Sequence, residues 1–129
     1  MQKSPTGPIR VFVVEDSALV RERLETLVAM AGAGSAGYAA GAGAAIRAIL
    51  SEQPDIVITD LRLADGSGFD VLREVHRAAP DIEIYMLSNF ATEPYRRIAR
   101  QLGAVDFFDK STEFRRISDV ISARAAAMH

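Results

Sequence analysis

Residues 56–72 read IVITDLRLADGSGFDVL, and they combine an apolar run, an Asp-Gly turn and the start of an amphipathic helix. The run begins with three apolar β-branched residues, which is typical of a strand buried on both faces of a parallel sheet that helices cover. Val71, Leu72 and Val75 recur at helical spacing, and Pro80 ends the helix that they predict. The stretch therefore predicts one strand followed by one helix of an α/β protein.

The same alternation continues in both directions along the chain. Runs of strand-forming residues predict strands at 9–15, 55–60, 82–88 and 105–108. Helical spacing predicts helices at 20–31, 44–51, 71–79, 94–102 and 114–121, the last with Ser111 or Thr112 as its N-cap. Residues 33–43 are almost all Ala and Gly, which form strands poorly, so we place only a short edge strand there, near 35–39. Five strand–helix repeats with right-handed crossovers predict a doubly wound α/β fold with a five-stranded parallel sheet and five helices.

The composition is that of one globular domain. The 129 residues, 49% hydrophobic and 25% charged, are too few for two full domains. A formal charge of −2 argues against nonspecific nucleic-acid binding, and no apolar run is long enough to span a membrane. The absence of cysteine excludes disulfides, thiolate metal sites and thiol catalysis, and a cytoplasmic location is the simplest expectation. Residues 1–8 are predicted to form a flexible tail.

Polar side chains follow the predicted strands at the ends where the chain leaves the sheet. They are Glu15 and Asp16 after the first strand, Asp60 at the end of the third, Ser88 at the end of the fourth and Lys110 after the fifth. Because the carboxyl ends of parallel strands meet at one edge of a sheet, we expect these five side chains to gather there.

The chemistry of this set is specific. Carboxylates that lie close together repel one another, and a divalent cation that prefers oxygen ligands relieves the repulsion. The ammonium group of Lys110 and the hydroxyl of Ser88 suit the oxygens of a phosphoryl group. Asp60 can itself accept that group as an aspartyl-phosphate. The residues therefore predict phosphoryl transfer to Asp60 with Mg²⁺, or Mn²⁺, as the cofactor.

Four motifs cover nearly the whole chain. They are VFVVEDS at 11–17, IVITDLRLADGSGFDVL at 56–72, IYMLSN at 84–89 and GAVDFFDKS at 103–111. In this order and at these intervals they resemble the receiver domain of two-component response regulators. The resemblance implies a CheY-like, flavodoxin-like fold with strand order 2-1-3-4-5, and a receiver domain at residues 9–127.

The resemblance implies a role for each acidic residue. Asp60 matches the phosphoacceptor, and Glu15 and Asp16 match the acidic pair that holds the metal ion together with Asp60. The backbone carbonyl of Arg62 is a further expected ligand. Proteins of this kind are signalling domains rather than turnover enzymes; they catalyse their own phosphorylation and hydrolyse the aspartyl-phosphate slowly.

The resemblance also implies a switch. Ser88 matches the hydroxyl that turns toward the phosphoryl group, and Lys110 matches the lysine that contacts it. Phe107 matches an aromatic side chain that becomes buried on phosphorylation. Strand alternation alone predicts that either Phe107 or Phe108 points inward and the other outward.

Protein partners are implied as well. A sensor histidine kinase or a histidine phosphotransfer protein would donate the phosphoryl group. Because the motifs occupy residues 9 to about 125, the output is expected to be contact with a downstream protein, onward transfer, or a fused domain outside this sequence. The candidate partner surface, which could also form a dimer, lies on the fourth helix, fifth strand and fifth helix. It includes Tyr95, Arg96, Arg100 and Arg115, although a solvated charged face explains these residues equally well.

Simpler interpretations exist for each site residue taken alone. Glu15 and Asp16 could be an acidic pair at a helix N-terminus, Ser88 a turn hydroxyl and Lys110 a solvated surface lysine. The alternative functions are a pseudo-receiver that binds without phosphorylation, an aspartyl-nucleophile phosphohydrolase and a flavodoxin-like cofactor binder. Arg62 argues against the phosphohydrolase, which resembles the haloacid dehalogenase family and needs an acid there. The lack of a Ser/Thr-rich loop after the first strand argues against the cofactor binder.

Overall fold

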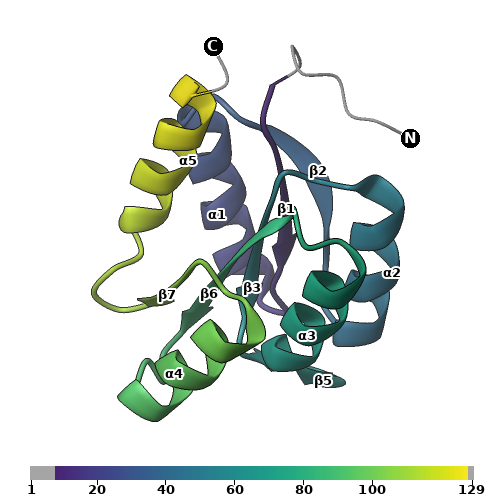
Figure 1. Cartoon of the computed structure of the whole chain (residues 1–129). Helices are drawn as coiled ribbons and strands as arrows, with labels where there is room; N and C mark the ends of the chain where they lie inside the picture. Colours follow the sequence, from purple (N-terminus) through teal and green to yellow (C-terminus); the bar gives the residue numbers. More distant parts are fainter. Residues whose placement is uncertain (1–7, 128–129) are drawn as a thin grey trace.

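Five parallel strands form the centre of the structure, and helices cover both faces of the sheet (Figure 1). The computed structural model describes residues 8–127, so the predicted tail at 1–8 lies outside the described residues apart from Pro8. The elements are β1 (Arg10–Val14), α1 (Ala18–Met30), β2 (Gly34–Ala39), α2 (Ala42–Glu52), β3 (Ile56–Asp60), β4 (Arg62–Leu63), β5 (Gly66–Ser67), α3 (Gly68–Ala78), β6 (Glu83–Ser88), α4 (Glu93–Leu102), β7 (Asp106–Asp109) and α5 (Arg116–Ala127). Within residues 8–127, no helix has the length and apolar character needed to cross a membrane.

The strand order of the sheet is β2-β1-β3-β6-β7, and all neighbouring strands are parallel. This confirms the predicted order 2-1-3-4-5, since the remaining two strands, β4 and β5, form a separate antiparallel hairpin. Of that hairpin, the sequence predicts only the Asp-Gly turn.

The predicted weak strand exists as β2 and lies at the edge of the sheet. Its register against β1 shifts between Val11 and Phe12. Gly37 has a φ of +116°, which side chains other than glycine rarely adopt, and a Cβ there would lie 3.3 Å from the Phe12 ring. The glycine that weakens the strand signal is therefore required by the close approach of β2 to Phe12.

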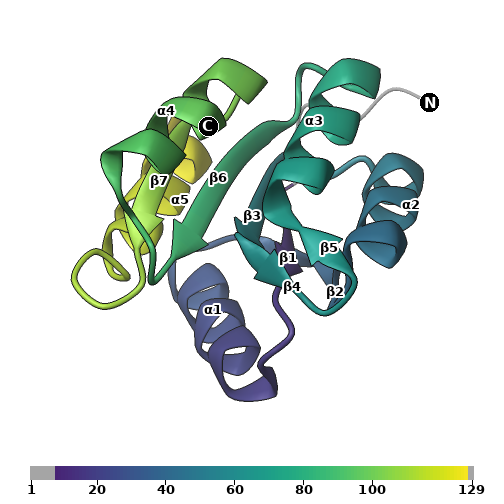
Figure 2. The same ribbon diagram turned by 90° about the horizontal axis from the view of Figure 1, so that it is seen from below.

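Helices α1 and α5 pack on one face of the sheet, and α2, α3 and α4 pack on the other (Figure 2). Alternate residues of β1 show the division: Val11 and Val13 join the core with α1 and α5, whereas Phe12 and Val14 join the opposite core. Phe107 and Phe108 likewise belong to opposite cores, and both are buried. The prediction that one of them points outward is wrong, because helices cover the sheet on both sides.

The start of α5 also differs from the prediction. The helix begins at Arg116, so neither Ser111 nor Thr112 is its N-cap. Both residues instead donate their backbone N–H groups to Asp109 Oδ1, at 2.7 and 3.2 Å. The Glu113 N–H donates to the Asp109 carbonyl at 2.8 Å. Asp109 therefore organises a turn at the position where sequence alone predicts a helix cap.

The turn of the β4–β5 hairpin is tied to α2. Asp65 Oδ1 accepts the backbone N–H of Ala42 at 2.5 Å, at the first turn of this helix. Gly41, the N-cap residue, has no side chain for this role, and a Cβ there would lie only 2.6 Å from Asp65 Oδ1. Asp65 thus caps a helix from a distant part of the chain, and the contact holds the loop after β3 in place.

Candidate functional site

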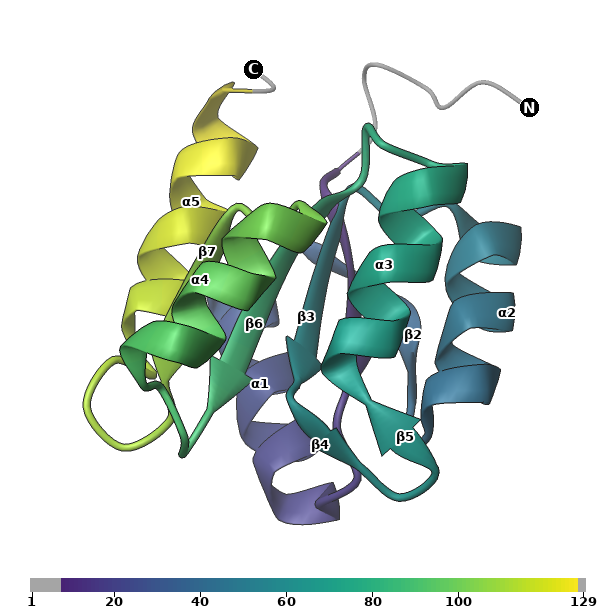
Figure 3. The same cartoon turned by 60° about the horizontal axis from the view of Figure 1, so that its bottom comes forward.

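The polar residues predicted to gather at one edge of the sheet do so. The carboxyl ends of β3 and β6 point to the same edge, beside the β4–β5 hairpin (Figure 3). Three of the side chains line a small pocket of about 80 Å³: Asp60, Ser88 and Lys110. The same pocket is lined by three residues around them, Arg62, Asn89 and Phe90. No role follows from the sequence for Asn89 or Phe90, although Asn89 ends the motif at 84–89; Phe90 lies just outside that motif.

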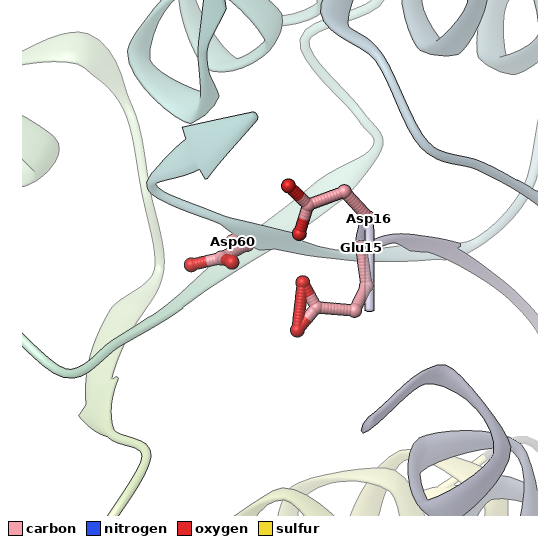
Figure 4. Close-up of side chains that lie close together, drawn as sticks. All are labelled: Glu15, Asp16 and Asp60. Atoms are coloured by element: carbon pink, nitrogen blue, oxygen red, sulfur yellow. The ribbon is translucent and has the colours of Figure 1, made fainter. Parts of the chain in front are cut away.

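Three carboxylates form a cluster next to this pocket. Glu15, Asp16 and Asp60 each offer an oxygen atom, and these atoms lie within 4.8 Å of one another. The side chains converge from the end of β1 and the end of β3 (Figure 4). Glu15 is buried with 1% of its side chain exposed, Asp60 has 11% exposed, and Asp16 is exposed. Solvent therefore reaches this cluster chiefly at Asp16.

Lys110 lies between two of these carboxylates. Its Nζ is 2.7 Å from Glu15 Oε1 and 2.9 Å from Asp60 Oδ2. Burial opposes the charge of the ammonium group, but the hydrogen bonds with Glu15 and Asp60 raise the pKa of Lys110 above its ordinary value. Lys110 therefore carries its charge at neutral pH and partly neutralises the cluster.

The surroundings of the Glu15 carboxyl group strongly affect its pKa. Burial, followed by the hydrogen bond and the charge of the neighbouring Asp60, raises the pKa of Glu15 to about 7, although Lys110 opposes the change. Its Oε2 atom is buried and has no hydrogen-bond partner in the described part of the chain. A buried carboxylate oxygen without a partner is costly, and a divalent cation would satisfy it. The three carboxylates therefore fit the predicted Mg²⁺ or Mn²⁺.

Asp60 is held by two contacts. Its Oδ1 accepts the Leu61 backbone N–H at 2.8 Å, and its Oδ2 accepts Lys110 Nζ. Asp60 ends β3, where Gly68 approaches its backbone so closely that a Cβ would lie 2.1 Å from the Asp60 carbonyl oxygen. A glycine at the start of α3 therefore allows the loop after β3 to fold back next to the acceptor.

Ser88 is buried at the end of β6. Its hydroxyl oxygen accepts the Phe90 N–H at 2.9 Å, and its carbonyl accepts the Lys110 N–H at 2.9 Å. Among the described residues the hydroxyl donates no hydrogen bond, so its proton is available to an oxygen placed in the pocket. The backbone bond to Lys110 joins the two residues that the sequence assigns to the phosphoryl group.

The opening of the pocket lies beside a cation–π contact. The guanidinium carbon of Arg62 is 4.3 Å from the centre of the Phe90 ring, and both side chains are exposed. The predicted role of the Arg62 carbonyl as a metal ligand stays a prediction.

The residues of the candidate partner surface have different environments. Tyr95 packs against Phe69 of α3, with 6.1 Å between the ring centres, and Arg100 pairs with Glu93 at 2.8 Å. Arg115 is exposed just before α5. Arg96 is half-buried, and its guanidinium group contacts Glu113 and the Phe107 carbonyl. The structure therefore leaves Arg100 and Arg115 more accessible than Arg96.

Known proteins resemble this chain in sequence and in fold. Residues 11–122 match the model of the response regulator receiver domain. Over 106 residues the chain is 38% identical to protein-glutamate methylesterase/protein-glutamine glutaminase 3 of Geobacter sulfurreducens; the match covers 81% of this chain and 28% of that protein. Over 113 residues it is 27% identical to chemotaxis protein CheY of Thermotoga maritima, covering 88% and 94% of the two chains.

Solved structures show the same fold. A two-component response regulator of the LuxR family from Aurantimonas sp. SI85-9A1 superposes with a TM-score of 0.85 at 26% identity, covering 94% of this chain and 87% of that one. The chain spans less than a third of the methylesterase and nearly all of the CheY protein, so the two relatives share one domain and differ in what surrounds it.

Proposed function

We propose that this chain, which belongs to the family of response regulator receiver domains, accepts a phosphoryl group on Asp60 and thereby switches a partner-binding surface. One observation carries the proposal: the Lys110 ammonium group bridges Glu15 and Asp60 beside a pocket that also contains Ser88. A lysine that only served as solvated surface would not lie between two carboxylates with 15% of its side chain exposed.

The transfer step uses groups that the structure brings together. An Asp60 carboxylate oxygen attacks the phosphorus of a phosphohistidine on the donor protein, an O–P bond forms, and the P–N bond breaks. The imidazole leaves with the bonding electrons and takes up a proton. Lys110 and Ser88 lie in the same pocket, so an ammonium group and a hydroxyl proton face the incoming oxygens. Mg²⁺ held by Glu15, Asp16 and Asp60, with the Arg62 carbonyl as a further proposed ligand, would supply positive charge to the transferred group.

The switch is proposed to involve Ser88, Lys110 and Phe107. The Lys110 N–H donates a hydrogen bond to the Ser88 carbonyl. If either residue moves toward a phosphoryl group, this hydrogen bond should shift the end of β7 as well. Phe107 is 2% exposed and packs in the core under α4, so it is already buried in this structure. We therefore expect Phe107 to respond by changing its rotamer within the core, which would alter the surface of α4, β7 and α5.

The partners follow from the same proposal. A histidine kinase or a histidine phosphotransfer protein donates the phosphoryl group, and a downstream protein or a fused output domain reads the altered surface. We also propose that a dimer forms through α4, β7 and α5, and that the protein acts in the cytoplasm. We expect no direct nucleic-acid binding by this domain, since its formal charge is −2.

The test is labelling by acetyl phosphate in the presence of Mg²⁺, followed by intact-protein mass spectrometry. We expect one phosphoryl group per wild-type chain and none on Asp60→Asn, because an amide is not a nucleophile for this reaction. Asp81→Asn is a matched control, since Asp81 is exposed in the turn before β6. Stoichiometric labelling of Asp60→Asn would refute the acceptor assignment, and an unlabelled wild-type protein would support the pseudo-receiver alternative.

A further inference from the structure

Glu113 connects three elements next to the site. Its Oε1 accepts the Asp109 backbone N–H at 3.0 Å and Arg96 Nη2 at 3.0 Å, and its Oε2 accepts Arg116 Nη1 at 2.7 Å. These donors come from the end of β7, from α4 and from the start of α5. Glu113 and Arg96 have 22% and 24% of their side chains exposed, so water screens their contact only partly.

Arg96 provides the second half of this connection. Its Nε donates to the Ala91 carbonyl at 3.2 Å, its Nη1 donates to the Phe107 carbonyl, and its Nη2 donates to Glu113. The guanidinium carbon also lies 5.6 Å from the centre of the Phe107 ring. One planar group thus binds the loop before α4, the backbone of β7 and the loop after β7. A lysine ammonium group could not reproduce this fixed geometry.

Lys110 lies within the segment that these contacts hold. Residues 109–113 form a closed turn, because the Glu113 N–H donates to the Asp109 carbonyl and Glu113 Oε1 accepts the Asp109 N–H. Lys110 is the residue of this turn whose side chain enters the acidic cluster. Another side-chain contact of the turn, between Ser111 Oγ and Asn89 Oδ1, is exposed and long at 3.5 Å. The Lys110 N–H bond to the Ser88 carbonyl and the Asp109 side chain also hold this turn, but Glu113 and Arg96 are the contacts that tie it to α4.

We propose that Arg96 and Glu113 are a positioning pair: they hold the turn after β7 so that the Lys110 ammonium group reaches Asp60, and they couple this turn to α4. The inference rests on the proposed phosphoryl transfer and adds two residues that touch neither the phosphoryl group nor the metal ligands. It also assigns Arg96 to the interior of the switch rather than to direct contact with a partner.

Charge supports this role over the full range of cellular pH. The backbone hydrogen bond from Asp109, followed by those from Arg96 and Arg116, holds the pKa of Glu113 at about 2. The contacts therefore persist whenever the chain is folded near neutral pH. Arg100 and Glu93 offer a contrast on the same helix, because their ion pair is exposed and reaches no residue of the site.

The test compares Glu113→Gln, Arg96→Lys and the double variant with the control Arg77→Gln, which changes an exposed arginine of α3. Two quantities are measured: the maximal rate of labelling by acetyl phosphate at saturating Mg²⁺, and the dissociation constant for Mg²⁺. We expect each single variant to lower the maximal rate about tenfold, because a misplaced catalytic group loses rate steeply with distance. The Mg²⁺ constant should stay within about twofold, since the carboxylate ligands lie on β1 and β3. The double variant should be no slower than the slower single variant, and Arg77→Gln should match wild type.

The outcomes separate this inference from the proposed function. If wild type is labelled on Asp60 and both single variants are labelled at the wild-type rate, the positioning pair is refuted while the acceptor assignment stands. If rate and Mg²⁺ affinity fall together, or if the two losses multiply in the double variant, the residues act only through general stability, and the inference is again refuted. If wild type is not labelled at all, the proposed function itself fails. Thermal melts of each variant ensure that rates are compared between folded proteins.

Discussion

Glu15 and Glu113 are both glutamates bound to a cationic side chain near the same edge of the sheet, and their pKa values move in opposite directions. Burial and the neighbouring Asp60 raise the pKa of Glu15 to about 7, although Lys110 is 2.7 Å away. A backbone N–H and two arginines lower the pKa of Glu113 to about 2. A cationic partner alone therefore does not determine whether a carboxylate is stabilised in its charged form.

The two environments differ in whether a partner is still needed. Glu15 belongs to a site that is suited to bind a cation, whereas Glu113 already has hydrogen-bond donors for both of its oxygens. Glu15 has a buried oxygen without a hydrogen-bond partner and a like charge beside it, so the folded chain holds it at a free-energy cost that a bound cation would remove. Glu113 has a donor for each oxygen, and it contributes to the stability of the loop.

Lys110→Met should have the largest effect. The substitution leaves Glu15 and Asp60 facing each other without the ammonium group, and removal of one partner from a buried ion pair typically costs about 3 kcal/mol. Urea denaturation in metal-free buffer measures this loss, and labelling by acetyl phosphate should fall with it. Arg73→Met is the matched control, because Arg73 forms an exposed pair with Asp70 on α3. An equal loss in both variants would show that Lys110 is no more important than a surface cation.

Addition of Mg²⁺ should stabilise the protein by mass action. At a hundredfold excess over its dissociation constant, the ion should add about 2.7 kcal/mol to the free energy of unfolding. The effect should disappear in Asp16→Asn, which removes a carboxylate of the cluster, and should remain in Asp81→Asn. Equal melting temperatures in EDTA and in excess Mg²⁺ would contradict the proposed metal site.

The pH dependence of stability should show the two glutamates separately in metal-free buffer. Because the pKa of Glu15 is raised in the folded state, the folded chain retains a proton that the unfolded chain loses, and stability should fall as pH rises from about 4.5 to about 7. Because the pKa of Glu113 is lowered, its contribution is complete above about 4.5 and should be lost as pH falls toward 2. Glu15→Gln should reduce the pH dependence of stability between about 4.5 and 7, and Glu113→Gln should reduce it below about 4.5. If one of these variants reduced the pH dependence of stability in both ranges, the assignment of each range to its own glutamate would be contradicted.

Glu113→Gln should have the smallest effect on stability at neutral pH. The amide oxygen can still accept one hydrogen bond, and partial exposure screens the lost charge, so we expect a decrease of about 1 kcal/mol in the free energy of unfolding. Denaturation of Glu93→Gln, which breaks the exposed pair with Arg100, provides the comparison. A larger loss in Glu93→Gln than in Glu113→Gln would show that the Arg96–Glu113 contact is an ordinary surface pair.

Much of this architecture was predictable because short apolar runs and helical spacing are local properties of the chain. The strand order, the edge position of β2 and the gathering of Asp60, Ser88 and Lys110 follow from such patterns together with the family motifs. The predictions that were wrong concern residues whose environment is set by parts of the chain that are distant in sequence. Phe107 and Phe108 alternate as expected, but both are buried because helices cover both faces. The predicted cap of α5 is replaced by a turn around Asp109.

Local patterns along the chain are enough to predict a doubly wound α/β domain with carboxylates, a hydroxyl and a lysine at one edge of its sheet. Which atoms meet depends on how the elements pack. Lys110 reaches Glu15 across 95 positions of the chain, Arg96 reaches Glu113 across 17, and Asp65 caps α2 across 23. The physical reason is that periodicity assigns a residue to a face or an end of an element, whereas contact depends on how distant elements pack against each other. The opposite pKa changes of Glu15 and Glu113 come from that packing and not from the identity of the residues.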